Sequence, residues 1–344
     1  MLAKAQLFER MAIVGIGLIG SSIAWATLRS GLAGTVLAYD ASAHVRQRAR
    51  ELGLAHFVPE TIAEAVGEAD LVVLCVPVGA MAAAAAAVAP HLKPGAIVSD
   101  VGSVKASVIA AVTPLLPDGV FFVPVHPVAG TEFSGPDAGF AELFETRWCL
   151  ITPCETSSEA AIERVGDLWR GFGAKVDTMT PEHHDMVLAI TSHVPHLIAY
   201  SIVGTAAHLE EVTNSDVIKF SANGFRDFTR IASSDPVMWR DVFLNNREPL
   251  LEMLARYSED LSALQRLVRW GDSEGLFQLL ARTSTIRRSL AAQGPPRPSS
   301  APREASDLGA NRDGIEESPL RAGLPRSTAN RNGHSHPTQS HIST

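Results

Sequence analysis

His126 stands among residues that are able to take part in proton transfer. It opens the polar segment His126–Glu132 (HPVAGTE), and a second polar segment, Ser99–Lys105 (SDVGSVK), carries the hydroxyl of Ser103. An imidazole with a hydroxyl partner can accept the proton of a substrate alcohol while hydride leaves the neighbouring carbon. The same histidine could instead cap a loop through its ring nitrogens, so the residue types alone leave a catalytic and a structural interpretation open.

A glycine-rich turn, Gly15–Gly20 (GIGLIG), follows an apolar run and precedes a helical one. The first glycine permits a tight turn, the second lets the backbone approach a pyrophosphate, and the third allows a helix to pack closely on a strand. The N-terminus of the next helix offers free N–H groups and a partial positive charge to phosphates. A turn that binds nothing is the alternative. We expect a dinucleotide site made by Gly15, Gly17, Leu18, Ile19 and Gly20.

Asp40 follows the next apolar run, 20 positions beyond the last glycine of this turn. A carboxylate there accepts hydrogen bonds from a ribose 2′-hydroxyl and repels a 2′-phosphate, so the pattern favours NAD over NADP. Arg46 or Arg48 could weaken this preference. Val76 and Pro77 end another predicted strand at the same edge and should line the cofactor groove.

Arg230 carries a planar guanidinium, which suits a carboxylate ligand. Other arginines of the same region have acidic neighbours, and we expect Arg226 with Asp227, and Arg240 with Asp241, to form structural pairs. Arg230 by itself could also be a surface ion-pair residue.

His193 and His196 are three positions apart and therefore share one face of a predicted helix. Together with His183 and His184 they could suggest zinc, but no cysteine or carboxylate cluster completes a ligand set. We expect no metal. We also expect His196 to face a substrate, and His183 and His184 to be solvated residues of a first helical turn.

Short apolar runs alternate with helical stretches over residues 11–180, which predicts a parallel sheet covered on both faces. Ligands of such sheets bind beyond the carboxyl ends of the strands, so the glycine turn and both polar segments should face one site. The predicted strands are Ala12–Gly15, Thr35–Tyr39, Leu71–Val76, Ala96–Asp100, Phe121–Val125, Cys149–Thr152 and Lys175–Met179.

The pattern becomes helix upon helix after Thr180, which looks like an N-cap followed by a proline at the first helical position. Pro195 lies inside this first helix and predicts a kink. Further helices are expected over Glu210–Ser221, Pro236–Asp260 and Leu261–Leu290.

The composition changes near Gly294, after which the chain has no Phe, Trp or Tyr and is dense in Pro, Ser and Arg. Such a segment cannot bury enough apolar surface to offset its ordering entropy. The expected organisation is a dinucleotide-binding domain (1–180), a helical substrate and dimerisation domain (181–293) and a disordered tail (294–344). The fold class is α/β, a doubly wound Rossmann-type sheet followed by an all-α dimerisation domain.

The overall composition excludes several classes of protein. A net charge of −8 and a pI near 5.8 argue against nucleic acid as the main partner. Three cysteines suggest no disulfide framework, and we read no signal peptide in Met1–Arg10. The longest run of small apolar residues, Gly79–Ala89, is too short to span a bilayer. A cytoplasmic protein without a membrane partner is expected.

Several segments of the sequence resemble the prephenate dehydrogenase family. They are, in chain order, GIGLIGSS, DVGSVK, HPVAGTE, TSHVPH and GFRDFTRIASSDPVMWRDVF, and the resemblance extends over about residues 11–255. It implies NAD-dependent conversion of prephenate to 4-hydroxyphenylpyruvate in tyrosine biosynthesis, by hydride transfer with loss of carbon dioxide. It also implies a homodimer built through the helical domain.

The resemblance assigns roles residue by residue. His126 matches a catalytic histidine that hydrogen-bonds the substrate hydroxyl, and Ser103 matches a serine that positions this histidine and reaches the nicotinamide. Arg230 matches an arginine that binds a substrate carboxylate. The pocket is implied to be lined by Ser192, His193 and His196, with Thr131 and Glu132 at its mouth.

Three alternatives stay open at this point. An enzyme of the same fold, such as a 3-hydroxyacid dehydrogenase or an imine reductase, would be expected to use a lysine in place of His126. A non-catalytic NAD-sensing dimer would not need His126, Ser103 and Arg230 together. An arogenate or dual-substrate cyclohexadienyl dehydrogenase differs only in the substrate side chain. His196 as a hydrogen-bond donor suits a keto acid better than an ammonium group, which favours prephenate.

Overall fold

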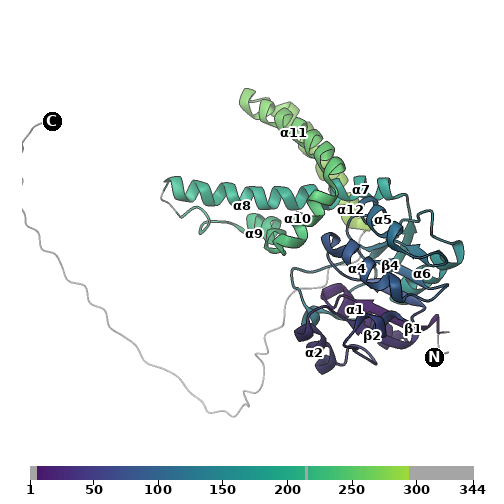
Figure 1. Ribbon diagram of the computed structural model, residues 1–344. Coiled ribbons are helices and arrows are strands. Elements are labelled where there is room, and N and C mark those ends of the chain that lie inside the picture. Colours follow the sequence, from purple (N-terminus) through teal and green to yellow (C-terminus); the bar gives the residue numbers. More distant parts are fainter. Residues whose placement is uncertain (1–5, 214–215, 294–344) are drawn as a thin grey trace, which may run out of the picture. The chain divides into compact units, whose positions relative to one another are not determined.

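A five-stranded parallel sheet forms the centre of the N-terminal part, with the strand order β2-β1-β3-β4-β5. The computed structural model describes residues 6–213 and 216–293 (Figure 1), so the predicted tail 294–344 lies outside the described residues. The order of the strands reverses between β1 and β3, and a crevice at such a reversal is where open α/β sheets bind ligands. The strands are β1 (Phe8–Val14), β2 (Ala33–Tyr39), β3 (Leu71–Leu74), β4 (Ile97–Asp100) and β5 (Phe121–Val123).

Both faces of this sheet are buried under helices. Met11 and Ile13 of β1 pack in one core with α1 (Leu18–Ser30) and α6 (Glu159–Gly171). Their neighbours Ala12 and Val14 pack in a second core with α4 (Met81–Val88) and α5 (Ala106–Val112). Alternate residues of a strand point to opposite faces, so a strand buried on both faces is apolar throughout. The predicted doubly wound sheet is confirmed.

The last two predicted strands, and the end of the predicted strand before them, do not join this sheet but form a second one. The predicted strand Phe121–Val125 is interrupted at Pro124, where β5 ends and β6 (Val125–Pro127) begins. Proline has no N–H to continue the ladder, so the chain leaves the parallel sheet there. β6 pairs antiparallel with β7 (Trp148–Ile151), and β7 pairs parallel with β8 (Lys175–Thr178). The expectation of one parallel sheet was wrong for these strands.

The remaining elements of the N-terminal part are short. They are α2 (Ala43–Leu52), α3 (Ile62–Val66) and the 3-10 turns η1 (Val78–Ala80), η2 (Ala89–His91), η3 (Thr113–Leu115) and η4 (Pro136–Ala138).

One continuous helical segment, Pro181–Thr213, opens the C-terminal part. It begins as predicted, because the Thr180 hydroxyl accepts a hydrogen bond from His183 N at 3.2 Å. It is built from α7 (Pro181–Leu188), a π-helical turn η5 (Ala189–His193) and α8 (Val194–Thr213). The sequence predicted a kink at Pro195, and the π turn ends two residues before this proline, which cannot donate to a preceding carbonyl. The kink itself stays a prediction.

The helices that follow end elsewhere than predicted. The helix α11 (Arg247–Trp270) ends where Gly271 adopts the left-handed conformation (φ 64°), whereas the sequence predicts a helix end at Asp260. The expected helix Glu210–Ser221 was also wrong, because α8 ends at Thr213. The observed elements are α9 (Asn223–Thr229), the 3-10 turn η6 (Arg230–Ser233), α10 (Pro236–Asn245), α11 (Arg247–Trp270) and α12 (Ser273–Gln293).

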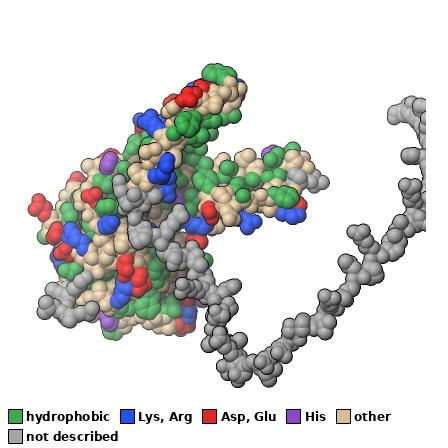
Figure 2. Space-filling view, turned by 180° about the vertical axis from the view of Figure 1, so that it is seen from behind, with side chains coloured by type: hydrophobic (Ala, Val, Ile, Leu, Met, Phe, Trp, Pro, Cys, Tyr) green, Lys and Arg blue, Asp and Glu red, His purple; other side chains and the backbone are tan. Residues whose placement is uncertain are grey.

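Large hydrophobic side chains lie exposed along the C-terminal helices, where Figure 2 shows them gathered. The segment Pro181–Thr213 is also long and apolar enough, by length and composition alone, to cross a membrane. It carries the buried polar residues His184, Asp185 and His193, which suit a core helix of a protein domain better than a lipid-facing one. The exposed residues include Ile202, Leu209 and Val212 of α8, Leu251, Leu261 and Val268 of α11, and Phe277, Leu280 and Ile286 of α12.

Candidate active site

The turn Gly15–Gly20 has no room for a side chain at its first and last glycine, but it has open space at Gly17, where a ligand could lie. Gly15 has φ +98°, and a Cβ there would lie 2.6 Å from the carbonyl oxygen of Cys75, which follows β3. A Cβ on Gly20 would lie 2.0 Å from the Gly15 carbonyl oxygen. Within residues 6–213 and 216–293, nothing lies within 4 Å of a Cβ on Gly17, and no side chain caps α1 at this residue. Leu18 and Ile19 form the first turn of α1. The backbone therefore fits a pyrophosphate group.

Asp40 is held against this turn. Its Oδ2 accepts a hydrogen bond from Ile16 N at 2.9 Å, and its Oδ1 accepts one from Ser42 N at 2.9 Å. Both nearby arginines are paired with carboxylates, Arg46 with Glu60 at 2.8 Å and Arg48 with Asp137. Their charges are thus neutralised, and the arrangement fits a ribose with a free 2′-hydroxyl, as in NAD.

The loop after β3 lies beside the same turn. The Val76 side chain approaches within 3.0 Å of where a Cβ of Gly15 would stand, and Pro77 is exposed. Burial raises the pKa of the Cys75 thiol well above its usual range, which fits an inert cysteine. The positions of Val76 and Pro77 agree with a groove-lining role, which stays a prediction.

His126 is buried in β6 and bonded to another histidine. Its Nδ1 lies 2.8 Å from Nε2 of His184, and Nδ1 of His184 lies 2.8 Å from Oδ1 of Asp185. His184 is completely buried, so the expectation that it is solvated was wrong. The reason is that Asp185 accepts hydrogen bonds from the backbone N–H groups of Lys105 and Ala106, at 2.8 and 2.9 Å, which holds this side of α7 against the start of α5.

A buried ion pair supports the start of β6. Lys105 and Asp100 are fully buried, and Lys105 Nζ donates to the Asp100 carboxylate and to the Val125 carbonyl oxygen, the latter at 2.7 Å. Asp100 also accepts from Gly102 N at 2.7 Å and from Val125 N at 3.3 Å. Every polar group of the pair has a partner, which a buried charge requires. The pair fixes the residue before His126. The sequence placed both residues in a polar segment but gave them no role.

Ser103 lies in the loop between β4 and α5 and is partly buried. In the part of the chain that is described, its hydroxyl makes no hydrogen bond with His126, whose Nδ1 is bonded to His184. The role of Ser103 in positioning His126, or in reaching the nicotinamide, therefore stays a prediction.

The π turn brings two further histidines toward one tryptophan. His193 is buried, its Nδ1 lies 2.9 Å from Nδ2 of Asn246, and burial lowers its pKa to about 4. His196 stacks on Trp239 with ring centroids 3.6 Å apart, and its Nδ1 lies 2.8 Å from the Ser192 carbonyl oxygen. Trp239 lies 6.1 Å from the His193 ring.

Arg230 lies near this cluster and near the loop after β6. Its guanidinium is 3.2 Å from the Glu132 carboxylate, and Thr131 precedes Glu132 in that loop. Burial, and then the charge of Arg230, lowers the pKa of His196. Burial lowers the pKa of His126 well below its usual range, and the charges of His184, Lys105 and His193 lower it further. His193 and His196 both contact Trp239, and a single pocket that joins them to His126 and Arg230 stays a prediction.

The two pairs expected among the other arginines had different outcomes. Arg240 and Asp241 are paired at 2.7 Å, as predicted. Arg226 instead donates to the Ser221 hydroxyl at 3.4 Å.

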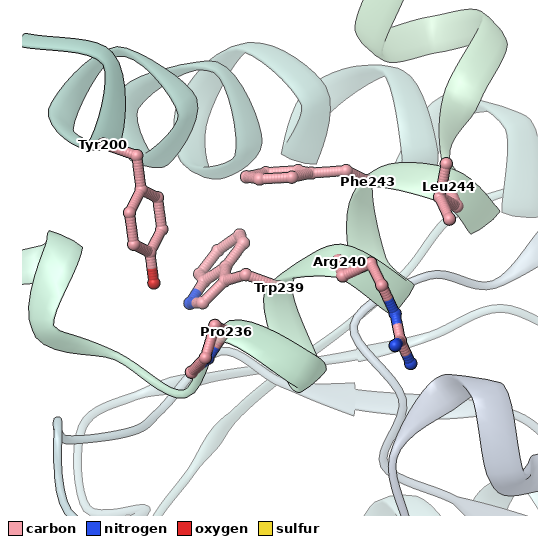
Figure 3. A pocket seen from close by; sticks show the side chains of 6 residues that line it. All are labelled: Tyr200, Pro236, Trp239, Arg240, Phe243 and Leu244. Atoms are coloured by element: carbon pink, nitrogen blue, oxygen red, sulfur yellow. The ribbon is translucent and has the colours of Figure 1, made fainter. Parts of the chain in front are cut away.

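An apolar pocket of about 340 Å³ adjoins Trp239 on the side of α8 and α10. Figure 3 shows the Trp239 and Tyr200 rings next to each other in this pocket. The Tyr200 hydroxyl donates to the Ser234 carbonyl oxygen at 2.8 Å. The lining residues are Tyr200, Pro236, Trp239, Arg240, Phe243 and Leu244.

Two family models match the chain. Residues 23–178 match the nucleotide-binding domain of prephenate dehydrogenase, and residues 180–282 match its dimerization domain. The chain belongs to the prephenate dehydrogenase family. Among curated members of this family, it is 44% identical over 292 residues to a cyclohexadienyl dehydrogenase of Zymomonas mobilis, covering 85% of this chain and 99% of that one. It is 32% identical over 286 residues to a prephenate dehydrogenase of Bacillus subtilis, covering 83% and 77%.

Solved structures of the prephenate dehydrogenase family have the same fold. The prephenate dehydrogenase of Aquifex aeolicus, in complex with hydroxyphenyl propionate and NAD+, matches with a TM-score of 0.77 and 32% identity, over 84% of this chain and all of that one (100%). An arogenate dehydrogenase of Synechocystis matches with a TM-score of 0.69 and 26% identity, over 82% and 99%. The exposed apolar helices α8, α11 and α12 lie mostly within the residues that match the dimerization domain.

Proposed function

We propose that this chain is an NAD-dependent prephenate dehydrogenase, which converts prephenate to 4-hydroxyphenylpyruvate and carbon dioxide for tyrosine biosynthesis. The observation that carries the proposal is the buried His126, whose Nδ1 is bonded to His184 so that Nε2 is left for a substrate, in a chain of this family. The relative in Bacillus subtilis is a prephenate dehydrogenase, and the related Aquifex structure contains NAD+.

The cofactor would be held by the backbone of Gly15–Gly20 and the N-terminus of α1, with Asp40 on a ribose and Val76 and Pro77 along the groove. Bound NAD supplies the acceptor for the hydride that leaves the ring carbon of the substrate. A site of this kind contributes mainly by alignment, because aromatisation of the ring supplies a large driving force.

His126 handles the proton of the substrate hydroxyl. Its Nε2 accepts a hydrogen bond from this hydroxyl and takes up charge as the hydride leaves the same carbon. The electron pair of the bond between the ring and its carboxylate then completes the aromatic ring, and carbon dioxide leaves. The hydroxyl oxygen recovers its proton, so His126 ends the reaction neutral. Burial holds the pKa of His126 well below its usual value, which keeps the ring in the neutral form that can accept a proton.

Arg230 is proposed to bind a substrate carboxylate, and Thr131, Ser192, His193 and His196 to line the pocket. The Arg230 side chain is 59% exposed and, among the described residues, pairs with Glu132 alone, so a carboxylate ligand can replace or join that partner.

Arogenate is a second candidate substrate, favoured by a specific contact. Nδ1 of His196 lies 2.8 Å from the Ser192 carbonyl oxygen and must therefore donate to it. The neutral His196 ring consequently presents an acceptor at Nε2, which suits an ammonium group, and only the protonated ring presents a donor to a keto acid. The Zymomonas relative is a cyclohexadienyl dehydrogenase, which makes dual use a specific alternative.

Steady-state kinetics with prephenate and arogenate, each with NAD and NADP, test the proposal. We expect NADH formation with prephenate and a preference for NAD. The His196→Asn variant should lose discrimination between the two substrates, and an unchanged ratio of kcat/KM values would remove His196 from specificity. Failure of both substrates to yield reduced cofactor would refute the proposed function.

We further propose that the protein works in the cytoplasm as a homodimer, without nucleic-acid or membrane partners. The match of residues 180–282 to a dimerization domain and the exposed hydrophobic residues of its helices support the dimer. Sedimentation or light scattering should give twice the chain mass of 36.6 kDa.

A further inference from the structure

A buried chain of hydrogen bonds leads away from His126 on the side opposite to its Nε2. It runs from His126 Nδ1 to His184 Nε2 (2.8 Å), and from His184 Nδ1 to Asp185 Oδ1 (2.8 Å). The three residues are 7%, 0% and 3% exposed, so no solvent competes for these contacts. They come from two elements, β6 and α7, that are far apart in the sequence.

The direction of each hydrogen bond follows from the Asp185 carboxylate. Its two oxygens accept from Lys105 N at 2.8 Å and from Ala106 N at 2.9 Å, at the start of α5. Both oxygens of this carboxylate therefore act as acceptors, and an ionised carboxylate has no hydrogen to donate. Nδ1 of His184 must therefore carry a hydrogen and donate it to Asp185.

The second ring nitrogen of His184 is then fixed as an acceptor. Burial lowers the pKa of His184, so the ring is neutral and its Nε2 carries a lone pair. Nδ1 of His126 must donate to this lone pair. In the neutral His126 ring, the remaining nitrogen, Nε2, is left without a hydrogen and can only accept.

We propose that His184 is a positioning residue, which holds His126 in the tautomer whose unprotonated Nε2 faces the substrate hydroxyl, and that Asp185 fixes His184 in turn. The proposal rests on the proposed function for the identity of the hydroxyl, while the tautomer itself does not. When His126 accepts the proton, the same contacts stabilise the imidazolium, because His184 Nε2 still accepts and the Asp185 charge lies behind it.

His184 and not Asp185 is the residue to change. The Asp185 side chain also accepts from the backbone N–H groups of Lys105 and Ala106 at the start of α5, so its replacement would disturb the fold. His184→Asn removes the acceptor that faces His126. His184→Gln places an amide oxygen nearer the position of Nε2 and should restore part of the contact. His183→Asn is a matched control, because His183 precedes His184 on α7 but is exposed.

The first measurement is the ¹⁵N spectrum of protein labelled in its histidines, with the His126 signals identified by their loss in His126→Asn. We expect His126 of the wild type to carry hydrogen on Nδ1 and none on Nε2, and to lose this fixed tautomer in His184→Asn. A wild-type His126 protonated on Nε2 would overturn the proposal, and this result does not require any variant to fold. An unchanged His126 tautomer in a folded His184→Asn variant would also overturn it.

The second measurement is kinetic. Partners that orient metal-bound histidines are typically worth about 10- to 100-fold, and we expect kcat of His184→Asn to fall by about the same factor while the KM values for substrate and NAD change little. His184→Gln should recover part of kcat, and His183→Asn should match the wild type. Equal kcat in His184→Asn and wild type would refute the positioning role. If the wild type converts neither prephenate nor arogenate, the proposed function fails, whereas the tautomer is still decided by the spectrum.

Discussion

The cofactor edge of the sheet and the histidine-bearing segment α7–η5 build their parts of the site in different ways. At the cofactor edge the site is formed by the backbone. Neighbouring backbone atoms leave no room for a Cβ on Gly15 or Gly20, whereas the space at Gly17 is open. In α7 and η5 the site is formed by side chains, because His184 is hydrogen-bonded to His126 of β6 and His193 to Asn246. One part depends on local chain geometry, and the other depends on contacts between distant elements.

This difference predicts how each part responds to substitution. A site built from backbone groups should keep its fold after a substitution that adds a Cβ in open space. It should lose stability where the added Cβ would collide with the backbone. A site made of buried polar side chains fails when a single partner is lost, because the remaining group stays buried without a hydrogen bond. Five changes test this contrast.

Replacing His126 should give the largest effect. In His126→Asn the proton acceptor at Nε2 is gone, and kcat should fall by about 10²- to 10⁴-fold, the usual contribution of a general base. NAD affinity, measured by fluorescence titration, should stay within a factor of about two, since the glycine turn is untouched. Normal turnover would rule out the assigned role.

Replacing the buried Lys105 should give the largest loss in the free energy of unfolding. Lys105→Met leaves Asp100 buried without its counter-ion, which typically costs about 3–5 kcal/mol in the free energy of unfolding. Lys93→Met is the control, because Lys93 pairs with Asp70 in a site that is 34% and 20% exposed and should lose about 1 kcal/mol or less. Urea denaturation of both variants measures the difference, and similar losses would contradict it.

Arg230→Ala should raise the KM for substrate without destabilising the fold. A hydrogen bond to a charged group is worth about 1.5–3 kcal/mol, which corresponds to roughly a 10- to 100-fold rise in KM. Its pair with Glu132 is largely exposed and should contribute less than about 1 kcal/mol to stability. An unaltered KM together with a lowered Tm would make Arg230 a structural residue.

Two alanine substitutions in the glycine turn should separate stability from cofactor binding. Gly20→Ala places a Cβ 2.0 Å from a backbone oxygen and should cost about 1–3 kcal/mol of stability. The Cβ of Gly17→Ala meets no described residue within 4 Å, so stability should change by less than about 0.5 kcal/mol while the Kd for NAD rises. Equal effects of the two variants on Tm would show that the turn is not organised in this way.

Acidification should destabilise the histidine cluster. The pKa of His193 is about 4 in the folded protein because the ring is buried, and about 6.5 in the unfolded chain. Below pH 6.5 the unfolded chain binds a proton that the folded ring does not, so stability is full above that pH and falls between pH 6.5 and 4. The contribution of His193 is at most about 1.4 kcal/mol per pH unit. Urea titrations of wild type and His193→Gln should show a shallower fall in the variant, and equal slopes would contradict this origin.

The cofactor edge could be predicted from the sequence because its signals are local. The apolar runs, the glycine spacing and Asp40 lie within one strand–helix–strand unit, and Gly15 and Asp40 have the contacts that such a unit requires. The partner of His126 could not be predicted in this way, because the burial of His184 depends on how α7 meets the start of α5. The adjacent His184 and Asp185 in a first helical turn were the only sequence signal.

The sheet shows the same limit. Each predicted strand exists, but the chain leaves the first sheet at Pro124 and β6 begins a second one. The residues of a strand do not show which other strand it will pair with, so the second sheet could not be predicted. The predicted helix ends were wrong where a single residue, such as Gly271 after α11, ends the helix.

The π turn at Ala189–His193 determines the angular relation between the two ends of the helical segment. An α-helix turns by about 100° per residue, and a π turn holds one residue more than an α-helical turn. Without this extra residue, the face of α7 that carries His184 would be rotated by roughly that angle relative to the face of α8 that carries His196. One inserted position thus allows a single helical segment to place His184 against His126 at one end and His196 against Trp239 at the other.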